Sequence, residues 1–508
     1  MNTPLTSSLR LRGLPATLAC LALGLAWPGV AAAQTNRTWS ATSTNPTWSV
    51  NGNWSGSVAP VANDSLFFAS TSGTRSLTND ILAGTTFNGI TFNSGASAYT
   101  LSGNSITLGG SVVNNSANSQ TIALPLSLSS TRTFTNNSNT TVTISGNISG
   151  AGGLVRDGTN SNTSIVNLTG TNTFAGDITV NAGVLQVGGN GVLGTSGTYA
   201  GTITLGGQGT HNRMVFMSDA NQTLTGNIVS TFSDSILFVQ NGAGLTGSGT
   251  VTLAAANPNF TSRLLVGASG VTTVSTLLLS HSNAAQNAIL EPRSSNKVAF
   301  ASGIGTFNVG MLDNNGGSGG GNVTLQDTSG AAITLSVGGN NRTTTAAYTG
   351  VLSGLGGLTK VGSGTLTLSG ANTYTGTTTI TAGQLTLSTA ANRLATTAPI
   401  TITGGVLDFN NFGQTTSGAI SFQGGTVQSG TLTSTGGAFD GQAGTVSAIL
   451  AGSVGLTKTT SGVLTLSGAD ANTYSGTTTV SAGRLNLNKT AGVNAVAGNL
   501  AITGGLVT

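Results

Sequence analysis

Charged residues are scarce in this sequence. Lys, Arg, Asp and Glu make up 6% of its 508 residues, against about 25% in an average soluble domain. The strong helix formers Glu, Lys, Arg and Met are therefore rare, which argues against a helical protein with ion pairs on its surface. Disordered chains combine high net charge with few β-branched residues, and this chain has neither feature. We therefore expect its backbone to form hydrogen bonds within β-sheets.

Cysteine and basic runs are also nearly absent. The single cysteine, Cys20, lies in an N-terminal segment that we expect to be removed. The mature chain would then contain no disulfide, so its stability must come from its strands and its core. The formal charge of +4 falls by two, to +2, once Arg10 and Arg12 are removed. Nucleic-acid binding needs a basic patch, so we predict no nucleic-acid partner.

Residues 1–33 have the organisation of a signal peptide. Two arginines precede an apolar stretch from Leu14 to Val30, and three alanines follow it. We predict cleavage between Ala33 and Gln34 and export of the remaining chain. The alternative is a membrane anchor, but two prolines interrupt the apolar stretch and no basic stop-transfer residues follow it.

Residues typical of metal and catalytic sites are few and scattered. The two histidines, His211 and His281, are far apart and lack acidic neighbours at ligand spacing. Residues 316–320 satisfy the G-x-S-x-G pattern, but they lie in a glycine run without the strand–turn–helix context of a nucleophile. Calcium-binding nonapeptides are absent. We therefore predict no cofactor, no metal ion and no catalytic residue.

Internal repeats are the most informative feature that is present. One block occurs plainly at residues 354–388 and 452–488, and a degenerate copy occurs at 150–188. In the first plain copy Leu366 and Leu368 alternate with threonine, which is the period of a half-buried strand. Leu385 follows Leu366 after 19 residues, and the other two copies give spacings of 21 (Leu464 to Leu485) and 19 (Val166 to Leu185).

A period of roughly 20 residues limits the possible folds. It is too short for a βαβ unit, which needs about 30 residues or more. It suits one turn of a parallel β-helix whose strands stack about 4.8 Å apart. We therefore predict an all-β fold, a right-handed single-stranded parallel β-helix. The alternative is a tandem of β-sandwich domains, because 98 residues separate Leu358 from Leu456. Shorter Gly-Gly motifs recur between the two blocks and argue against it.

The corners of such coils require residues that tolerate positive φ, chiefly Gly and Asn. Asn172, Asn372 and Asn472 hold equivalent positions after the Leu-x-Leu strands. We expect them at one type of corner, where their side-chain amides can form hydrogen bonds.

Aromatic residues concentrate at the beginning of the mature chain. Trp39, Trp48 and Trp54 are followed by several phenylalanines. The open end of a β-helix exposes core and unpaired backbone that must be covered. We therefore divide the mature chain into an aromatic N-terminal cap region at 34–100 and a parallel β-helix at 101–508. The alternative for the tryptophans is a platform for stacking sugars.

Polysaccharide lyase or glycosidase activity is the enzymatic alternative. Glycoside hydrolysis needs two carboxylates about 5–9.5 Å apart. Asp157 and Asp177 are 20 residues apart and are therefore candidates for neighbouring coils, although we expect Asp157 in a loop. The stretch from Glu291 to Lys297 is a weak charged cluster, which we interpret as a polar loop interrupting a coil. We therefore predict that the protein is not an enzyme.

At the repeats the sequence resembles the autotransporter-associated β-strand repeat family, whose passengers have a pectin-lyase-like β-helix. The second plain copy has a two-residue insertion, and the degenerate copy has Phe174 in place of tyrosine. The residues that match the motif in the two plain copies are Gly357, Leu358, Leu366, Leu368, Asn372, Tyr374, Gly376, Gly383 and Leu385, and then Leu456, Leu464, Leu466, Asn472, Tyr474, Gly476, Gly483 and Leu485.

The resemblance implies a secreted or surface-exposed structural and adhesive rod without catalytic activity, in a Gram-negative-type bacterium. It also implies export through a C-terminal β-barrel or attachment by a C-terminal sorting signal. The sequence stops within what reads as another coil, so we expect a fragment that would reach the outer membrane only through a missing region. The expected partners are glycans, other cells or further copies of the chain. The alternative is a polysaccharide-binding or polysaccharide-degrading β-helix protein.

Overall fold

The computed structural model describes residues 34–40, 45–71, 75–207, 212–240, 249–267, 275–314, 320–344 and 346–508. It divides the chain into Met1–Gln34 and Thr35–Thr508, and the second unit is the one described below. The predicted signal peptide with Ala33, together with His211 and residues 316–319, lies outside the described residues.

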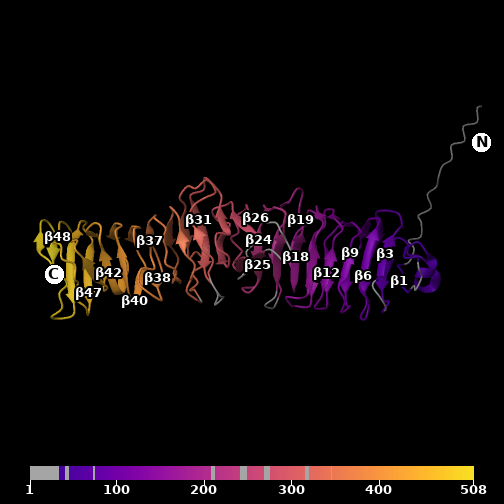
Figure 1. The fold of residues 1–508 in the computed structure, drawn as a ribbon, viewed down its shortest axis with the longest axis horizontal. Coiled ribbons are helices and arrows are strands. Elements are labelled where there is room, and N and C mark those ends of the chain that lie inside the picture. The colour runs from indigo at the N-terminus through magenta and orange to yellow at the C-terminus, as the bar shows by residue number, and fades with distance from the viewer. Residues whose placement is uncertain are drawn as a thin grey trace, which may run out of the picture. The chain divides into compact units, whose positions relative to one another are not determined.

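The second unit is a stack of β-coils in which each strand pairs in parallel with its equivalents in the coils before and after (Figure 1). About 19 turns form this solenoid, and helix accounts for 1% of the structure. The parallel β-helix predicted from the repeat period is confirmed. No helix within the described ranges is long and apolar enough to cross a membrane.

The register of the repeats is the one that their spacing predicts. Leu366 in β36 (Thr365–Leu368) pairs with Leu385 in β38 (Gln384–Leu387). Leu464 in β47 (Val463–Gly468) pairs with Leu485 in β49 (Arg484–Lys489). These leucines are at most 2% exposed, and burying one leucine side chain contributes about 1.5–3 kcal/mol. The inward columns of leucine are therefore a main source of stability.

One ladder of strands runs through most of the stack, from β3 (Arg75–Asn79) to β50 (Leu500–Ile502). In the degenerate repeat this ladder contains a Leu-x-Leu strand, β18 (Val184–Gly189), which pairs with β15 (Ile165–Leu168). In the first plain repeat it contains the threonine-rich strand β37 (Thr378–Ile380) instead. The Leu-x-Leu strands of the plain repeats form a separate sheet with β36, β38, β47 and β49. Equivalent strands thus belong to different ladders in the two halves.

This exchange occurs at two long strands, β29 (Ala285–Pro292) and β31 (Thr306–Leu312). The preceding strand β27 (Arg263–Val266) pairs with the second half of β29. The following strand β33 (Thr334–Val337) pairs with the first half of β31. The register between β29 and β31 shifts after Ala285. The two long strands therefore carry the ladder from one side of the coil to the next without interruption.

The three N-terminal tryptophans lie inside the first coils. Trp39, Trp48 and Trp54 are at most 1% exposed. Edge-to-face contacts join them, with ring centroids 5.2 Å apart for Trp39–Trp54 and 6.1 Å for Trp48–Trp54. Rings buried in this way have no free face for stacking on a sugar. Strand pairing already begins in this region, where β1 (Asn36–Trp39) pairs with β2 (Ser65–Phe68). The region boundary at residue 100 stays a prediction.

Candidate functional site

The motif residues of the plain repeats lie in the interior or at tight corners of the coils. The leucines and tyrosines among them are at most 2% exposed, and Asn372 and Asn472 are 5% and 2% exposed. Gly376 and Gly476 lie so close to the preceding coil that a Cβ atom would be 2.5 and 2.4 Å from its backbone. Gly383 and Gly483 have φ values of +62° and +66°, which favour glycine, and a Cβ atom at either position would lie 2.3 Å from a backbone oxygen. All these positions serve the stacking of coils.

The corner asparagines join three successive coils. The Oδ1 atom of Asn372 accepts a hydrogen bond from the Leu352 amide of the preceding coil at 2.8 Å, and its Nδ2 donates to the Arg393 carbonyl of the next coil at 2.6 Å. Asn472 makes the same two bonds, with Leu450 at 3.0 Å and Ala495 at 2.7 Å. Each amide thus satisfies buried backbone groups on both sides. We had expected asparagine at these corners for its tolerance of positive φ, but Asn172, Asn372 and Asn472 do not have positive φ, so their side-chain hydrogen bonds explain these positions instead.

The tyrosine of each plain repeat has a matched threonine. The Tyr374 hydroxyl lies 2.5 Å from the Thr378 hydroxyl, and the Tyr474 hydroxyl lies 2.7 Å from that of Thr478. The degenerate repeat has phenylalanine at 174, and its equivalent of the threonine is Ile178, which is fully buried. In the degenerate repeat the tyrosine and the threonine are therefore both replaced by apolar residues, because a buried hydroxyl needs a hydrogen-bonding partner.

A buried cation occupies one inward position of every repeat, a feature that our sequence analysis missed. Lys360, Lys458 and Arg156 are at most 1% exposed. The Lys360 ammonium donates to the carbonyls of Val361 at 2.5 Å and Gly362 at 3.0 Å. Burial lowers the pKa of Lys360 to about 8 and that of Arg156 to about 10. The sequence did contain a signal for this feature. The basic residue occupies a position that the alternation of side chains along the strand places inward.

The two candidate carboxylates do not meet. Asp157 belongs to β14 (Leu154–Gly158) and not to a loop, which corrects our expectation. Leu154 pairs with Ile178, so Asp177 lies beside residue 153, four positions before Asp157. Four residues along a strand span about 13 Å, which exceeds the separation used for glycoside hydrolysis.

Metal-binding clusters of His, Cys, Asp and Glu are absent from the part of the chain that the structure describes. His281 is half-buried, and its Nδ1 atom accepts a hydrogen bond from the Asn283 amide at 3.0 Å. This contact closes a local turn and leaves the histidine without the acidic neighbours of a ligand set.

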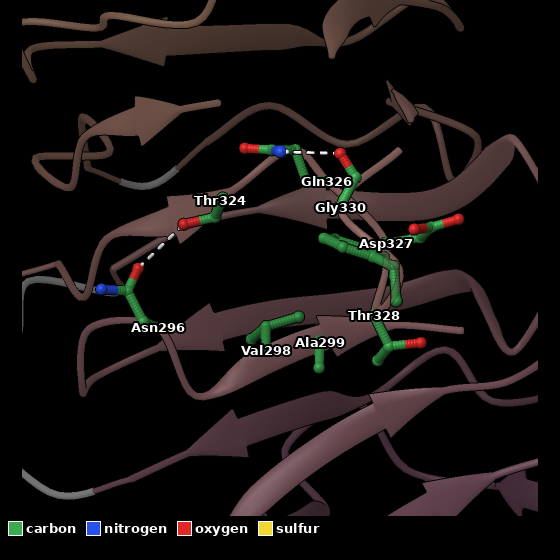
Figure 2. A pocket seen from close by; sticks show the side chains of 9 residues that line it. Asn296, Val298, Ala299, Thr324, Gln326, Asp327, Thr328 and Gly330 are labelled. Atoms are coloured by element: carbon green, nitrogen blue, oxygen red, sulfur yellow. Dashed lines mark hydrogen bonds between the residues drawn. The ribbon is translucent and has the colours of Figure 1, made fainter. Parts of the chain in front are cut away.

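A polar groove of about 390 Å³ opens beside β30 (Val298–Phe300) and β32 (Val323–Thr324) (Figure 2). The Thr324 hydroxyl donates to Asn296 Oδ1 at 3.1 Å, and Gln326 Nε2 donates to the Gly330 carbonyl at 2.8 Å. The Asp327 carboxylate accepts a bond from the Ser329 hydroxyl at 2.6 Å, which lowers the pKa of Asp327. The groove thus offers amide, hydroxyl and carboxylate groups over an apolar floor.

A charged cluster lies at the crossing of the ladder, where we had predicted a polar loop. Glu291 and Pro292 belong to β29, and Glu291 is 1% exposed, so that prediction was wrong for these residues. Arg263 binds both oxygens of Glu291, with Nε–Oε1 and Nη2–Oε2 distances of 2.5 and 2.7 Å. Burial lowers the pKa of Arg263, but the bond to Glu291 outweighs it and raises the pKa overall.

The outer surface around this cluster is apolar, unlike the outer surface of the repeats. Outward side chains of four neighbouring strands form a hydrophobic cluster separate from the core; its members are Val184, Val215, Ile236, Phe238 and Leu265. A hollow of about 170 Å³ lies beside Arg263 and Glu291 and is also lined by Asp234, Asp313 and Arg342. Alternation in the sequence did not reveal this surface, because both faces of these strands are apolar.

Comparison with known proteins gives two matches. The family model described as "Passenger-associated-transport-repeat" matches residues 159–187, 358–387 and 456–487. The "Adhesin BmaC autotransporter" of Brucella suis biovar 1 (strain 1330) is 28% identical over 389 residues, which is 69% of this chain and 10% of that protein. This chain therefore spans about a tenth of the relative's length. No solved structure matches. The chain thus combines a parallel β-helix with three stretches that are similar to passenger-associated transport repeats.

Proposed function

We propose that this passenger β-helix is displayed on the surface of a Gram-negative bacterium, where it acts as a non-catalytic adhesive stalk. The observation that carries this proposal is the ladder that continues from β3 to β50 through stacked coils. A stack held by backbone hydrogen bonds at every coil is stiff, and it can present its side surfaces at a distance from the cell. The similarity to a protein named as an adhesin supports the same function.

The outer surface of the C-terminal coils suits contacts with hydroxyl-rich molecules. On the threonine-rich face, Thr359, Thr379, Thr401 and Ser421 pair in register from one coil to the next. Their side chains point away from the core, because Leu358, Ile380 and their equivalents point inward. Such a row offers donors and acceptors without charge.

The polar groove of Figure 2 lies on different sheets, beside β30 and β32, and we infer that it contacts a glycan on the target. Its amide and hydroxyl groups can bind sugar hydroxyls, and Val298 and Ala299 provide an apolar floor for the sugar ring. A volume of about 390 Å³ lies within the usual range of about 300–1,000 Å³ for ligand pockets.

The test is adhesion of cells that display the chain, compared with cells that display none. Thr328→Arg places a long side chain at the exposed rim of the groove, and we expect it to reduce adhesion. Thr375→Arg, at an exposed corner elsewhere, is the matched control and should adhere like the wild type. If displaying the wild-type chain gives no gain in adhesion, the proposal fails. If both variants adhere fully, the groove is not the contact.

A further inference from the structure

One leucine of the first plain repeat lies on the outer surface. Leu355 precedes β35 and is 55% exposed, whereas Leu358, three residues later, is fully buried. The repeats do not require a leucine at this position, because the equivalent residue is Ser453 in the second plain copy and Ala151 in the degenerate copy. A single exposed leucine is common on protein surfaces, and its significance depends on its surroundings.

Leu355 lines a hollow of about 260 Å³ on the threonine-rich face. Threonines of three successive coils line it as well; they are Thr334, Thr359, Thr377 and Thr379. The other lining residues are glycine, alanine and isoleucine, so the wall of the hollow holds no charged side chain. The hollow thus combines one exposed apolar side chain with several uncharged donors and acceptors.

The hydroxyl groups of these four threonines are available to a ligand. Among the described residues, none of the four hydroxyls forms a hydrogen bond with another side chain or with a carbonyl. The threonines of the next outward row differ, because Thr381 and Thr403 donate to carbonyls of the preceding coil at 2.8 and 3.2 Å. Hydroxyls without such bonds can bind a ligand without first breaking a hydrogen bond within the protein.

The hollow adjoins the polar groove of Figure 2 across one exposed turn. The turn runs from Gln326, which lines the groove, to Ala332, which lines the hollow, and these two residues form an antiparallel bridge. The Asp327 carboxylate accepts hydrogen bonds from the amides of Ser329 and Ala331 at 2.9 and 3.0 Å, which close the turn. The groove and the hollow therefore share one wall.

We propose that the hollow is a subsite for a neutral sugar residue of a polysaccharide, with Leu355 against the apolar face of the sugar ring and the threonine hydroxyls on the sugar hydroxyls. This subsite rests on the proposed adhesive function and names one class of its targets. An acidic sugar fits less well, because its carboxylate would find no lysine or arginine in the lining. A volume of about 260 Å³ lies below the usual range of about 300–1,000 Å³ for ligand pockets and suits a single sugar residue.

The experiment measures binding of polysaccharides to the purified full chain by calorimetry. Laminarin, dextran and galactomannan are the neutral probes, and polygalacturonate is the acidic control. We expect at least one neutral polymer to bind, with an affinity that added salt leaves unchanged because no ion pair forms, and polygalacturonate to bind far more weakly. Leu355→Ser should weaken binding by about three- to tenfold, because it removes the apolar contact. Thr377→Val should weaken it by about threefold, the loss of one hydrogen bond.

Matched variants separate a binding role of Leu355 from a structural one. Leu82→Ser removes an exposed leucine from an N-terminal coil, and Thr401→Val removes a hydroxyl from the same outward row outside the hollow. Both variants should bind like the wild type. Without polymer, Leu355→Ser should melt at the wild-type temperature, because the second plain repeat already has serine at this position.

Three binding results would overturn the proposal. They are no binding of any neutral polymer, equal binding of polygalacturonate, and wild-type affinity in Leu355→Ser. Sedimentation tests the other occupant, which is a second copy of the chain. A wild type that self-associates without binding polymer, and a Leu355→Ser variant that stays monomeric, would assign the hollow to a contact between chains.

Adhesion of displayed cells keeps the two proposals distinguishable. If Leu355→Ser loses polymer binding while its cells adhere fully to the target surface, the subsite stands and adhesion uses another surface. If the wild-type chain binds polymer but gives no adhesion, the adhesive function fails and the subsite remains. If cells adhere through a chain that binds no neutral polymer, only the subsite fails. Thr375, the control position for adhesion, is not among the residues that line the hollow.

Discussion

The repeat coils and the central coils differ most in the side chains on their outer surfaces. In the repeats, Asn372, Tyr374 and Lys360 bring polar groups into the interior, while the outer surface carries uncharged hydroxyls. The central coils also bury an amide, Asn257, which accepts a hydrogen bond from the Ile228 amide and donates one to the Ala284 carbonyl. Their outward side differs, because it carries the ion pair of Arg263 and Glu291 and a hydrophobic cluster. Inward polar groups must match the coils above and below, so they recur as a motif. Outward groups have no such constraint, and they are where specific binding can evolve.

The largest loss of stability is expected from a charge placed in the apolar column of a repeat. Leu366→Asp places a charge in the core, and we expect it to cost on the order of 5 kcal/mol in local stability. Thr367→Asp, one position along the same strand, faces outward and should change stability by about 0.5 kcal/mol or less. Hydrogen exchange of the amides in β36 and β38 measures both. Equal losses of protection in the two variants would contradict the inward–outward alternation.

The second effect tests the ion pair of the central coils. Glu291→Ala leaves the Arg263 guanidinium without its partner, and we expect a cost of about 3–5 kcal/mol, seen as faster exchange in β27 and β29. The control is the double variant Arg263→Met, Glu291→Leu, which removes both charges and should recover most of the loss. A double variant as unstable as the single one would mean that the pair provides more than charge balance.

Strand pairing can be predicted from the sequence only where the number of residues per coil is nearly constant. Leu366 and Leu385 could be paired from the sequence, because the repeats keep a nearly constant period. The pairing of Arg213 and Arg263 across Ile236 could not, because the two steps along the chain are 23 and 27 residues. Glu291 was misplaced in a loop, since charge and a following proline suggest exposure. The crossing of the ladder at β29 and β31 depends on tertiary pairing that no local pattern records.

A third, smaller effect concerns the tyrosine–threonine pair. Thr378→Val keeps the shape of the side chain but leaves the Tyr374 hydroxyl buried without a partner, which should cost about 1–3 kcal/mol. Adding Tyr374→Phe and placing isoleucine at 378 reproduces the pair that the degenerate repeat already uses at Phe174 and Ile178. We expect this double variant to regain most of the loss in denaturant unfolding. Thr379→Val, which alters the outward neighbour, should be nearly neutral.

The smallest effect is a dependence of repeat stability on pH. The pKa of Lys360 is about 8 in the folded chain, below the ordinary value of 10.5. Between these values the unfolded chain binds more protons, so the free energy of unfolding should rise with pH. Burial raises the pKa of Tyr374 from 10.0, so ionisation of the unfolded tyrosine opposes this rise above pH 10. The rise should therefore be confined to about pH 8–10.

Lysine variants assign this pH dependence to one residue. Lys360→Met removes the buried ammonium, so hydrogen exchange in β35 (Gly357–Lys360) and β37 should then lose its dependence on pH beyond the intrinsic rate. Lys297→Met makes the same chemical change at a half-buried position outside the repeats and should keep the wild-type profile. A wild-type stability that stays level between pH 8 and 10, and that falls above pH 10.5 more steeply than the stability of Lys360→Met, would mean that the carbonyls around Lys360 stabilise its charge more than burial disfavours it. In that case the hydrogen bonds of the Lys360 ammonium would stabilise the corner, and burial of this lysine would increase the stability of the repeat.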